Sequence, residues 1–336
     1  MNTQPGLDGD ADMGIATHLR QHPGLRGKTG LGLVTEILGP TDWVSGPGDD
    51  AAAIACLSGG GEAFVLAAGE AIFPPFVRAD PYQAGIAAVV TNVNDIAAMG
   101  GRPAGIVDTI VAAEESARLI LQGLKAAAGL YDVPVVGGHL TLREDCDPSL
   151  SAFAVGHARR PLSATNVTEG QALLLACCTD GRMRDDFPFF SSLTERGQRL
   201  AGDVRVLAGL ADEGHCTAAK DVSMAGLLGS LAMLLEPTGC GAAIDLAAIP
   251  RPAGVPLTRW LGAFPLYAFL LCAPPEQAGS CRQTFRDRGL ACEQIGRIDA
   301  TGRLRAITRA GEVSLLDLAR DRVTGLARPV AAHVPG

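Results

Sequence analysis

Features that would assign the chain to a special class of protein are scarce. No run of about 18 uncharged apolar residues occurs, so the sequence predicts no membrane-spanning helix. The nine cysteines form no CxxC pair, which predicts reduced, small apolar side chains rather than disulfides. With 28 basic against 36 acidic side chains, the net charge of −8 disfavours nucleic acid as a partner. Acids rather than basic residues stand at Met1–Asp12, so we expect no signal peptide and a cytoplasmic protein.

The residues that are plentiful indicate a globular protein of mixed α and β structure. The chain has 336 residues, 47% of them hydrophobic, which suits one large or two mid-sized domains. Its 42 glycines and 21 prolines are spread along the chain and therefore predict many short elements. Apolar patterns predict strands at 64–67, 106–111, 133–136, 151–155, 172–176, 242–246 and 267–272, and helices at 83–99, 116–130, 197–213 and 224–235.

Two α/β halves are the best division of the sequence. The periodic pattern breaks near His157–Leu162, which predicts a boundary between domains at 28–160 and 161–324. Residues 1–27 and 325–336 are rich in Gly, Pro and small side chains, so we expect two flexible ends.

Acidic side chains in glycine-rich, apolar surroundings are the main candidates for chemistry. Asp49 and Asp50 follow Gly48 in a turn that precedes an apolar strand. Two adjacent carboxylates repel each other, and a divalent cation relieves that repulsion. The alternative is an ordinary solvated turn, in which Gly and Asp are common.

Asp95 is a lone acid on a predicted helix rich in Ala, Ile and Val. Asn92, Asp95 and Met99 share one face of that helix by their spacing. Because a buried unpaired carboxylate is unfavourable, Asp95 requires a cation or a hydrogen-bond partner. In the alternative, Asn94 or Asp95 caps a helix that begins at Ile96.

A pair of glycines, Gly137 and Gly138, follows an apolar strand and precedes His139. A turn of this kind lets backbone N–H groups approach an anion without a Cβ in the way. His139 is then a candidate for contact with phosphate or metal. The alternative is a plain turn with a hydrogen-bonded histidine.

Lys220, Asp221 and Ser223 stand at the end of a predicted strand, before a helix of small residues. In one interpretation Asp221 coordinates a metal beside a helix N-terminus that receives phosphate. In the other, Asp221 or Ser223 is simply the N-cap of the helix.

These clusters occur in the order Gly48–Ala52, Asn94–Gly100, Gly137-Gly138, Asp221–Ser223 and Gly241–Leu246. This order resembles the aminoimidazole ribonucleotide (AIR) synthetase-related superfamily, over about residues 28–310. The superfamily includes AIR synthetase, thiamine-monophosphate kinase, selenophosphate synthetase and the hydrogenase-maturation dehydratase.

The resemblance implies a two-domain AIR synthetase-like fold of the α/β and α+β classes. The N-terminal sheet would form a barrel in a homodimer, and the C-terminal domain would be α+β. ATP and Mg²⁺ would bind between the domains, and several acids sharing one apolar cleft agree with such a cation-bound polyphosphate. The implied metal ligands are Asp49, Asp50, Glu70, Asp95 and Asp221; the implied nucleotide-binding residues are Gly48, Asn94, Gly137, Gly138, His139 and Ser223; and the implied catalytic cations are Lys220 and Lys28.

Departures from the superfamily pattern place the chain in an uncharacterised branch. His139 and Met224 stand where relatives usually have acids, so two carboxylates are missing. The resemblance implies an ATP-dependent kinase or synthetase acting on a small molecule. The alternative is a catalytically reduced ATP-binding protein that regulates or assembles with a partner.

A loop at Cys177–Ser192 is the candidate substrate segment. Arg182 and Arg184 lie there among three acids and three phenylalanines. Arginine forks suit phosphate or carboxylate, and aromatic rings exclude water. The alternative is a surface loop whose charges pair with one another.

Overall fold

The computed structural model describes residues 9–38, 48–58, 61–185, 187–309 and 311–326. The chain forms two compact units, each built from separate stretches of sequence. We name them the five-stranded unit, residues 50–162 and 191–216, and the seven-stranded unit, residues 1–49, 163–190 and 217–336. The domain limits predicted from the sequence, at 28–160 and 161–324, stay a prediction.

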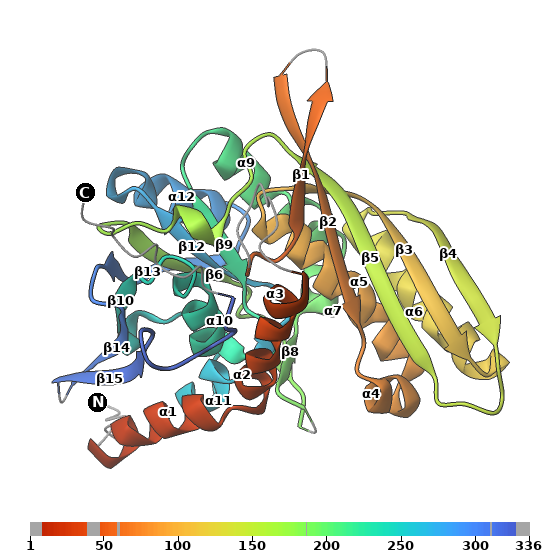
Figure 1. The fold of residues 1–336 in the computed structure, drawn as a ribbon, viewed down its shortest axis with the longest axis horizontal. Coiled ribbons are helices and arrows are strands. Elements are labelled where there is room, and N and C mark those ends of the chain that lie inside the picture. The colour runs from red at the N-terminus through yellow and green to blue at the C-terminus, as the bar shows by residue number, and fades with distance from the viewer. Residues whose placement is uncertain (1–8, 39–47, 59–60, 186, 310, 327–336) are drawn as a thin grey trace. The chain divides into compact units, whose positions relative to one another are not determined.

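The five-stranded unit contains one mixed sheet with the order β1-β2-β5-β3-β4 (Figure 1). All of its pairs are antiparallel except β3 with β4, which is parallel. Alternation along β5 buries every second residue, which explains why periodicity alone located this strand. The strands are β1 (Ala52–Ser58), β2 (Gly61–Ala71), β3 (Arg102–Ala112), β4 (Val135–Leu142) and β5 (Ser149–Ala158).

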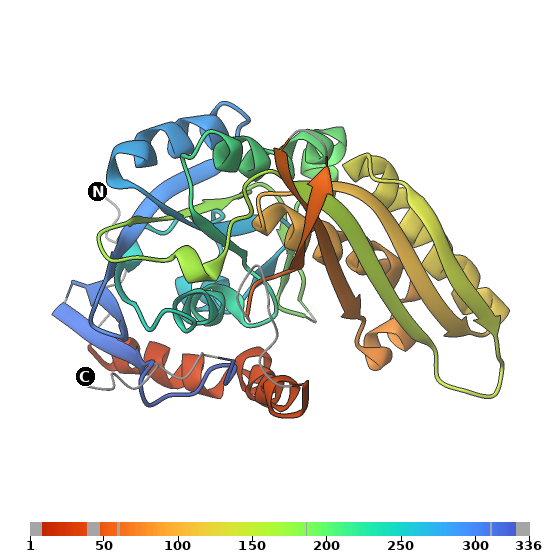
Figure 2. The same ribbon diagram turned by 45° about the horizontal axis from the view of Figure 1, so that its top comes forward.

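Two long helices, α5 (Pro81–Ala98) and α6 (Glu114–Tyr131), cover one face of this sheet (Figure 2). They approach each other closely at Gly85 and Gly123, where a Cβ would stand 2.2 Å from the Ile120 carbonyl oxygen and 2.0 Å from the Tyr82 carbonyl oxygen, respectively. Asp80 caps α5 by accepting a hydrogen bond from the Gln83 N–H, and α4 (Pro74–Ala79) precedes it. Both long helices match the sequence expectation.

The expected helix at 197–213 is broken into short pieces. Gly197 has a φ of 51° and interrupts the first turn. A buried ion pair between Arg196 and Asp203, 2.6 Å long, ties the pieces together. The pieces are α7 (Leu193–Arg196), η3 (Gly197–Arg199), α8 (Leu200–Asp203) and α9 (Val206–Asp212).

The seven-stranded unit contains a sheet with the order β15-β14-β10-β13-β6-β12-β9. Its central strands β6 and β12 are fully buried, so they read in the sequence as continuous apolar runs. The strands are β6 (Ala172–Cys177), β9 (Ala218–Asp221), β10 (Gly241–Asp245), β12 (Ala268–Ala273), β13 (Ala291–Asp299), β14 (Arg303–Thr308) and β15 (Gly311–Asp317).

A second, three-stranded sheet in this unit has the order β11-β8-β7. It consists of β7 (Arg182–Met183), β8 (Phe189–Ser191) and β11 (Phe264–Pro265). The helices of the unit are α1 (Gly9–Gln21), α2 (Pro23–Lys28), α3 (Gly32–Leu38), α10 (Gly226–Leu235), α11 (Leu257–Leu261) and α12 (Ala278–Arg286), with short 3-10 turns η1 (Thr29–Leu31), η2 (Ala164–Asn166), η4 (Leu246–Ala248) and η5 (Pro275–Gln277).

The N-terminal stretch differs from the flexible end that its composition predicts. Residues 9–28 form α1 and α2, and Ile15, Leu19 and Leu25 join the apolar core of the seven-stranded unit. These side chains recur every four to six residues, and burying them stabilises helices that composition alone does not indicate. Residues 1–8 and 327–336 lie outside the described part of the chain.

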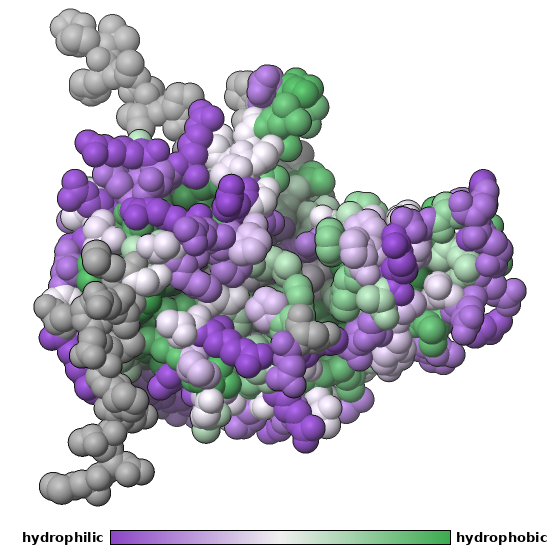
Figure 3. Space-filling model, turned by 90° about the horizontal axis from the view of Figure 1, so that it is seen from below, coloured by the Kyte–Doolittle hydropathy of each residue, from purple (hydrophilic) through white to green (hydrophobic). Residues whose placement is uncertain are grey.

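None of the helices in the described ranges is both long enough and apolar enough to cross a membrane. The surface seen from below mixes hydrophilic and hydrophobic patches (Figure 3).

Candidate metal centre

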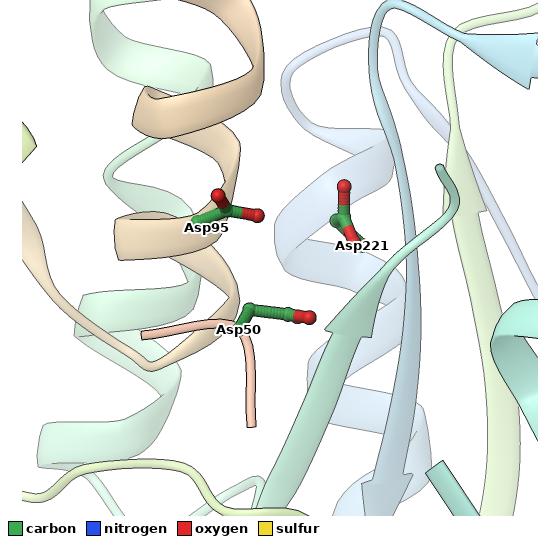
Figure 4. Close-up of side chains that lie close together, drawn as sticks. All are labelled: Asp50, Asp95 and Asp221. Carbon is green, nitrogen blue, oxygen red and sulfur yellow. The ribbon is translucent and has the colours of Figure 1, made fainter. Parts of the chain in front are cut away.

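Two of the predicted metal ligands meet within the five-stranded unit. Asp50 lies just before β1, and Asp95 lies in the last turn of α5. One carboxylate oxygen of each lies within 4.8 Å of the other, and both side chains are half-buried (Figure 4). Val93 and Ile96, on other faces of α5, are fully buried and so fix the rotation of the helix about its axis. With that rotation, the Asp95 side chain points toward Asp50.

The same helix excludes the capping alternative. Asn94 and Asp95 lie inside α5, which begins at Pro81 and is capped by Asp80. Neither residue therefore begins a helix at Ile96. Asn94 is 1% exposed, so the helix buries a polar amide next to the acid.

Asp221, also drawn in Figure 4, is the last residue of β9 in the seven-stranded unit. It is 3% exposed, and its carboxylate oxygen lies 4.0 Å from Nζ of the buried Lys220. Pairing with β12, where Asp221 is opposite Phe269, fixes the backbone at this position. The helix after it, α10, begins at Gly226 without a side-chain cap, so neither Asp221 nor Ser223 is its N-cap.

Ser223 and Lys28 have local structural settings. The Ser223 N–H donates to Ser230 Oγ at 3.2 Å, which links the β9–α10 turn to α10. Lys28 is the last residue of α2 and is half-buried. Their predicted roles with nucleotide stay predictions.

Asp49 and Glu70 have other surroundings. The Asp49 carboxylate accepts hydrogen bonds from Ser163 Oγ at 2.6 Å and from the Ala164 N–H at 2.7 Å, which connects it to the start of η2. Glu70 is exposed on β2, opposite Ala152 of β5. Within the described ranges neither acid belongs to a group of three or more close metal-binding side chains. Their assignment as ligands stays a prediction.

The expected turn at Gly137 and Gly138 is wrong. Both glycines lie inside β4, paired with Val107 and Asp108 of β3, and His139 continues the strand. The strand is at the sheet edge and therefore exposed, so the pattern of a buried strand ending in a turn did not apply. The His139 ring shares a hydrogen bond with Thr141 Oγ1 at 3.2 Å.

Sequence reasoning missed Asp108, the partner of Gly138 across the β3–β4 ladder. Asp108 is 6% exposed, and burial raises the pKa of its carboxyl. A Cβ on Gly138 would stand 2.7 Å from Asp108 Oδ2, so the glycine leaves room for this acid. The signal was a single acid inside the apolar run 106–111.

The two loop arginines occupy different positions. Arg182 lies on β7, and Arg184 follows it, with its N–H donating to the Phe189 carbonyl. The Arg184 carbonyl accepts a hydrogen bond from Arg259, a residue that the sequence analysis did not single out. Only the structure shows that α11 reaches this loop.

Two family models match this chain. The N-terminal domain of AIR synthase related protein matches residues 48–158, and the C-terminal domain matches residues 192–309. The chain belongs to the AIR synthase related family. This membership confirms the resemblance drawn from the motifs and the two-domain architecture of mixed α and β structure.

Similar proteins include both uncharacterized and named members. An uncharacterized protein from Synechocystis sp. is 34% identical over 281 residues, covering 83% of this chain and 86% of its own length. Phosphoribosylformylglycinamidine synthase subunit PurL from Bradyrhizobium sp. is 31% identical over 325 residues, which are 89% of this chain and 41% of PurL. This chain therefore spans less than half the length of that PurL.

A solved structure shows the same fold. AaThiL complexed with AMPPCP and TMP superimposes with a TM-score of 0.63 at 19% identity, covering 84% of this chain and 95% of AaThiL.

Proposed function

We propose that the protein is a cytoplasmic, ATP- and Mg²⁺-dependent enzyme that transfers the γ-phosphoryl group of ATP to an oxygen of a small metabolite. A new bond forms between phosphorus and the acceptor oxygen, and the bond to ADP breaks. The enzyme is a kinase if the reaction ends there, and a synthetase if a nucleophile then displaces phosphate. The proposal rests on the carboxylate pair of Asp50 and Asp95, found in a chain that belongs to the AIR synthase related family.

The donor set of this pair fits Mg²⁺. Carboxylate oxygens are the ligands that this hard cation prefers. Two half-buried acids with oxygens within 4.8 Å repel each other unless a positive charge lies near them. In the arrangement that we propose, Asp221 at the end of β9 joins this pair as a third carboxylate ligand.

The chain's other residues would position the triphosphate. When bound, Mg²⁺ would neutralise charge on the phosphate oxygens. Lys220, which is 7% exposed, would offset the negative charge that develops during transfer. Gly137 and Gly138 lie in strand β4 and not in a turn, so their proposed contact with phosphate rests on the family resemblance alone. Asp49, Glu70 and Lys28 would complete the site. Gly48, Asn94, His139 and Ser223 are the remaining proposed nucleotide contacts.

Similar proteins support nucleotide binding. AMPPCP is an analogue of ATP, and the AaThiL structure that contains it matches 84% of this chain. PurL, a synthase subunit, is the named relative at 31% identity. The acceptor is a small molecule bound near Arg182 and Arg184.

A second candidate function is favoured by the residues at His139 and Met224. Acids expected from the superfamily pattern are absent at both positions. Fewer acids would bind fewer cations and so weaken catalysis. In this alternative the protein binds ATP in order to regulate or assemble with a partner.

We also propose that the protein is a homodimer formed through the five-stranded sheet. The face opposite α5 and α6 exposes Ile54, Val136, Phe153 and Val155, with exposed fractions of 44% to 65%. Phe153 and Val155, two residues apart on β5, share one face of the sheet, and Ile54 lies on the same face because it pairs with Val65, which pairs with residue 157 of β5. A second copy would remove this apolar surface from water.

Nucleotide binding can be tested by thermal unfolding with ATP and Mg²⁺. The complex should raise the melting temperature, and EDTA should cancel the increase. Asp95→Asn should weaken Mg²⁺-dependent ATP binding by roughly tenfold or more. Asp132→Asn makes the same chemical change at an exposed position and should leave binding unchanged.

Catalysis is tested separately by phosphate release from ATP in the presence of a panel of small metabolites. Turnover that Asp50→Asn and Asp95→Asn both abolish supports the enzyme. Turnover that survives both substitutions would falsify the metal assignment. Mg²⁺-dependent ATP binding without turnover on any metabolite favours the regulatory alternative.

A further inference from the structure

An open pocket of about 570 Å³ lies within the seven-stranded unit. We call it the loop pocket. Residues 179–183 form one side, residues 252–256 and Arg259 form the other, and Phe190 also lines it. Its volume falls in the range of about 300–1,000 Å³ typical of sites for small metabolites.

Ring packing, a hydrogen bond and strand pairing hold the frame of the loop pocket together. Phe190 is 1% exposed and packs edge-on against Trp260, with ring centroids 5.3 Å apart. The Trp260 indole N–H donates to the Pro250 carbonyl at 2.9 Å, which connects α11 to the segment before it. On the other side, β8 pairs with β11 in the register Phe189 to Phe264. The pocket wall therefore keeps its shape without help from the charged side chains.

One of the two arginines of the loop pocket is already held by the protein. Arg259 Nη2 donates to the Arg184 carbonyl at 2.5 Å and lies 3.9 Å from the Asp185 carboxylate. These contacts fix its guanidinium at the rim. Arg259 therefore supplies a positioned positive charge.

Arg182 and Asp180 differ from Arg259. Within the described part of the chain, neither side chain makes a hydrogen bond or an ion pair, although both line the same pocket. The Arg182 guanidinium and the Asp180 carboxylate, both in the described ranges, form no ion pair with each other and lie apart in the pocket wall. The loop pocket thus offers one positive and one negative group to a ligand, at different points of its wall.

The charges and the wall together indicate the ligand class. Two arginines and one aspartate give the lining a net positive charge, which favours an anion. The free carboxylate of Asp180 favours a ligand that also carries an ammonium group. Met183, Phe190 and Val255 provide apolar surface for a short hydrocarbon chain between these groups.

We propose that the loop pocket binds an anionic amino acid, with an oxyanion of the ligand on Arg182 and its ammonium group on Asp180. The role of this ligand as phosphoryl acceptor rests on the function proposed above. Its binding requires neither ATP nor Mg²⁺, because all of the groups involved lie in the seven-stranded unit.

Calorimetric titration of the full chain with L-aspartate and with succinate, in EDTA and without nucleotide, tests the proposal. The two probes differ only in the amine. L-Aspartate should bind about tenfold more tightly than succinate. Asp180→Asn should remove that difference, and Arg182→Gln should weaken both probes by about tenfold or more.

Arg297→Gln is the matched control, since Arg297 is exposed on β13 and outside the loop pocket. It should bind both probes like the wild type. A circular dichroism melt of each variant establishes that it is folded, and Arg182→Lys should recover part of the affinity because it restores the charge.

The proposal is overturned if neither probe binds at millimolar concentration, or if Arg182→Gln binds L-aspartate as tightly as the wild type. It is also overturned if inorganic phosphate binds more tightly than L-aspartate and succinate binds with the same affinity as L-aspartate, since the loop pocket is then a simple anion site. If these titrations fail while Mg²⁺-dependent ATP binding is intact, the amino-acid ligand is rejected and the proposed enzyme function stands. If the titrations succeed but the protein does not bind ATP, the enzyme function is rejected and the loop pocket stands as an amino-acid site.

Discussion

Asp108 has an environment that is unfavourable for its charge. It is 6% exposed on β3, and its carboxylate makes no hydrogen bond or ion pair with any residue in the described ranges. Burial raises the pKa of its carboxyl above the ordinary value of 3.8. The folded protein therefore loses stability as the pH rises from 3.8 through the raised pKa, because the unfolded chain gives up its proton first.

We expect Asp108→Asn to stabilise the protein at pH 7. The substitution keeps the shape and removes an unpaired charge, a gain of about 1 kcal/mol in the free energy of unfolding. Thermal unfolding should show a melting temperature roughly 2 °C higher. A lower melting temperature in the variant would contradict this account and indicate that the carboxylate is stabilised where it lies.

His22 gives the opposite response to pH. It is 8% exposed, and its Nε2 lies 3.3 Å from the Gly262 carbonyl oxygen. Burial is the main cause that lowers the pKa of His22 below 6.5, and the nearby His18 adds to it, while the Gly262 carbonyl opposes it. Since the unfolded chain binds the proton more readily, stability is lost as the pH falls from 6.5 through the lowered pKa.

The expected result is a decrease in melting temperature between pH 7.5 and pH 5.5 that is smaller in His22→Gln. Gln keeps a hydrogen-bond donor but does not titrate. Equal pH dependence in the wild type and the variant would exclude His22 as the cause.

At the scale of elements, the contact between α5 and α6 depends on glycine. A Cβ on Gly123 would stand 2.0 Å from the Tyr82 carbonyl oxygen, so the helices could not keep their separation. Gly129 lies on the same helix, and a Cβ there would meet nothing within 4 Å.

Gly123→Ala should therefore destabilise the protein by about 1–3 kcal/mol through overpacking. Gly129→Ala should instead be neutral or stabilising by up to about 1 kcal/mol, because Ala favours the helix. Denaturant unfolding measures both, and equal free energies of unfolding for the two variants would show that the helices adjust without loss.

At the scale of the whole molecule, the apolar face of the five-stranded sheet determines the assembly that we expect. Phe153 and Val155 are each 44% exposed on the central strand of that face. Phe153→Asp should convert the dimer to a monomer, because a second copy would bury the new charge.

Light scattering measures this change in mass. Leu121→Asp introduces the same charge at an exposed position of α6, which covers the opposite face, and should leave the dimer intact. A wild-type protein that is monomeric at tens of micromolar would end the dimer proposal.

Comparison of the elements shows which parts of the fold were predictable. The apolar pattern located α5 and α6 to within about two residues at each end, and it located β5 but not its limits, since the strand extends beyond the predicted 151–155. Helix α1 was missed because its stability comes from packing of Ile15 and Leu19 in the core, not from its composition. Gly137 and Gly138 were placed in a turn because nothing local distinguishes a turn from an exposed edge strand.

The residues of the candidate site were likewise predictable only in part. Motif order identified the family and named Asp50, Asp95 and Asp221 as acids to examine. It did not separate them from Asp49, which instead accepts hydrogen bonds from the start of η2. It also gave no sign that Arg259, far along the chain, would line the loop pocket with Arg182.

The amino-acid sequence by itself determined the family, the periodic helices and strands, and the set of residue types that can bind a cation, because these depend on local order along the chain. Tertiary structure decided which acid meets which, that β4 is an edge strand, and that the charges of Asp180 and Arg182 remain available in the loop pocket. Those outcomes depend on contacts between residues distant in sequence, and their geometry is fixed only when the core packs.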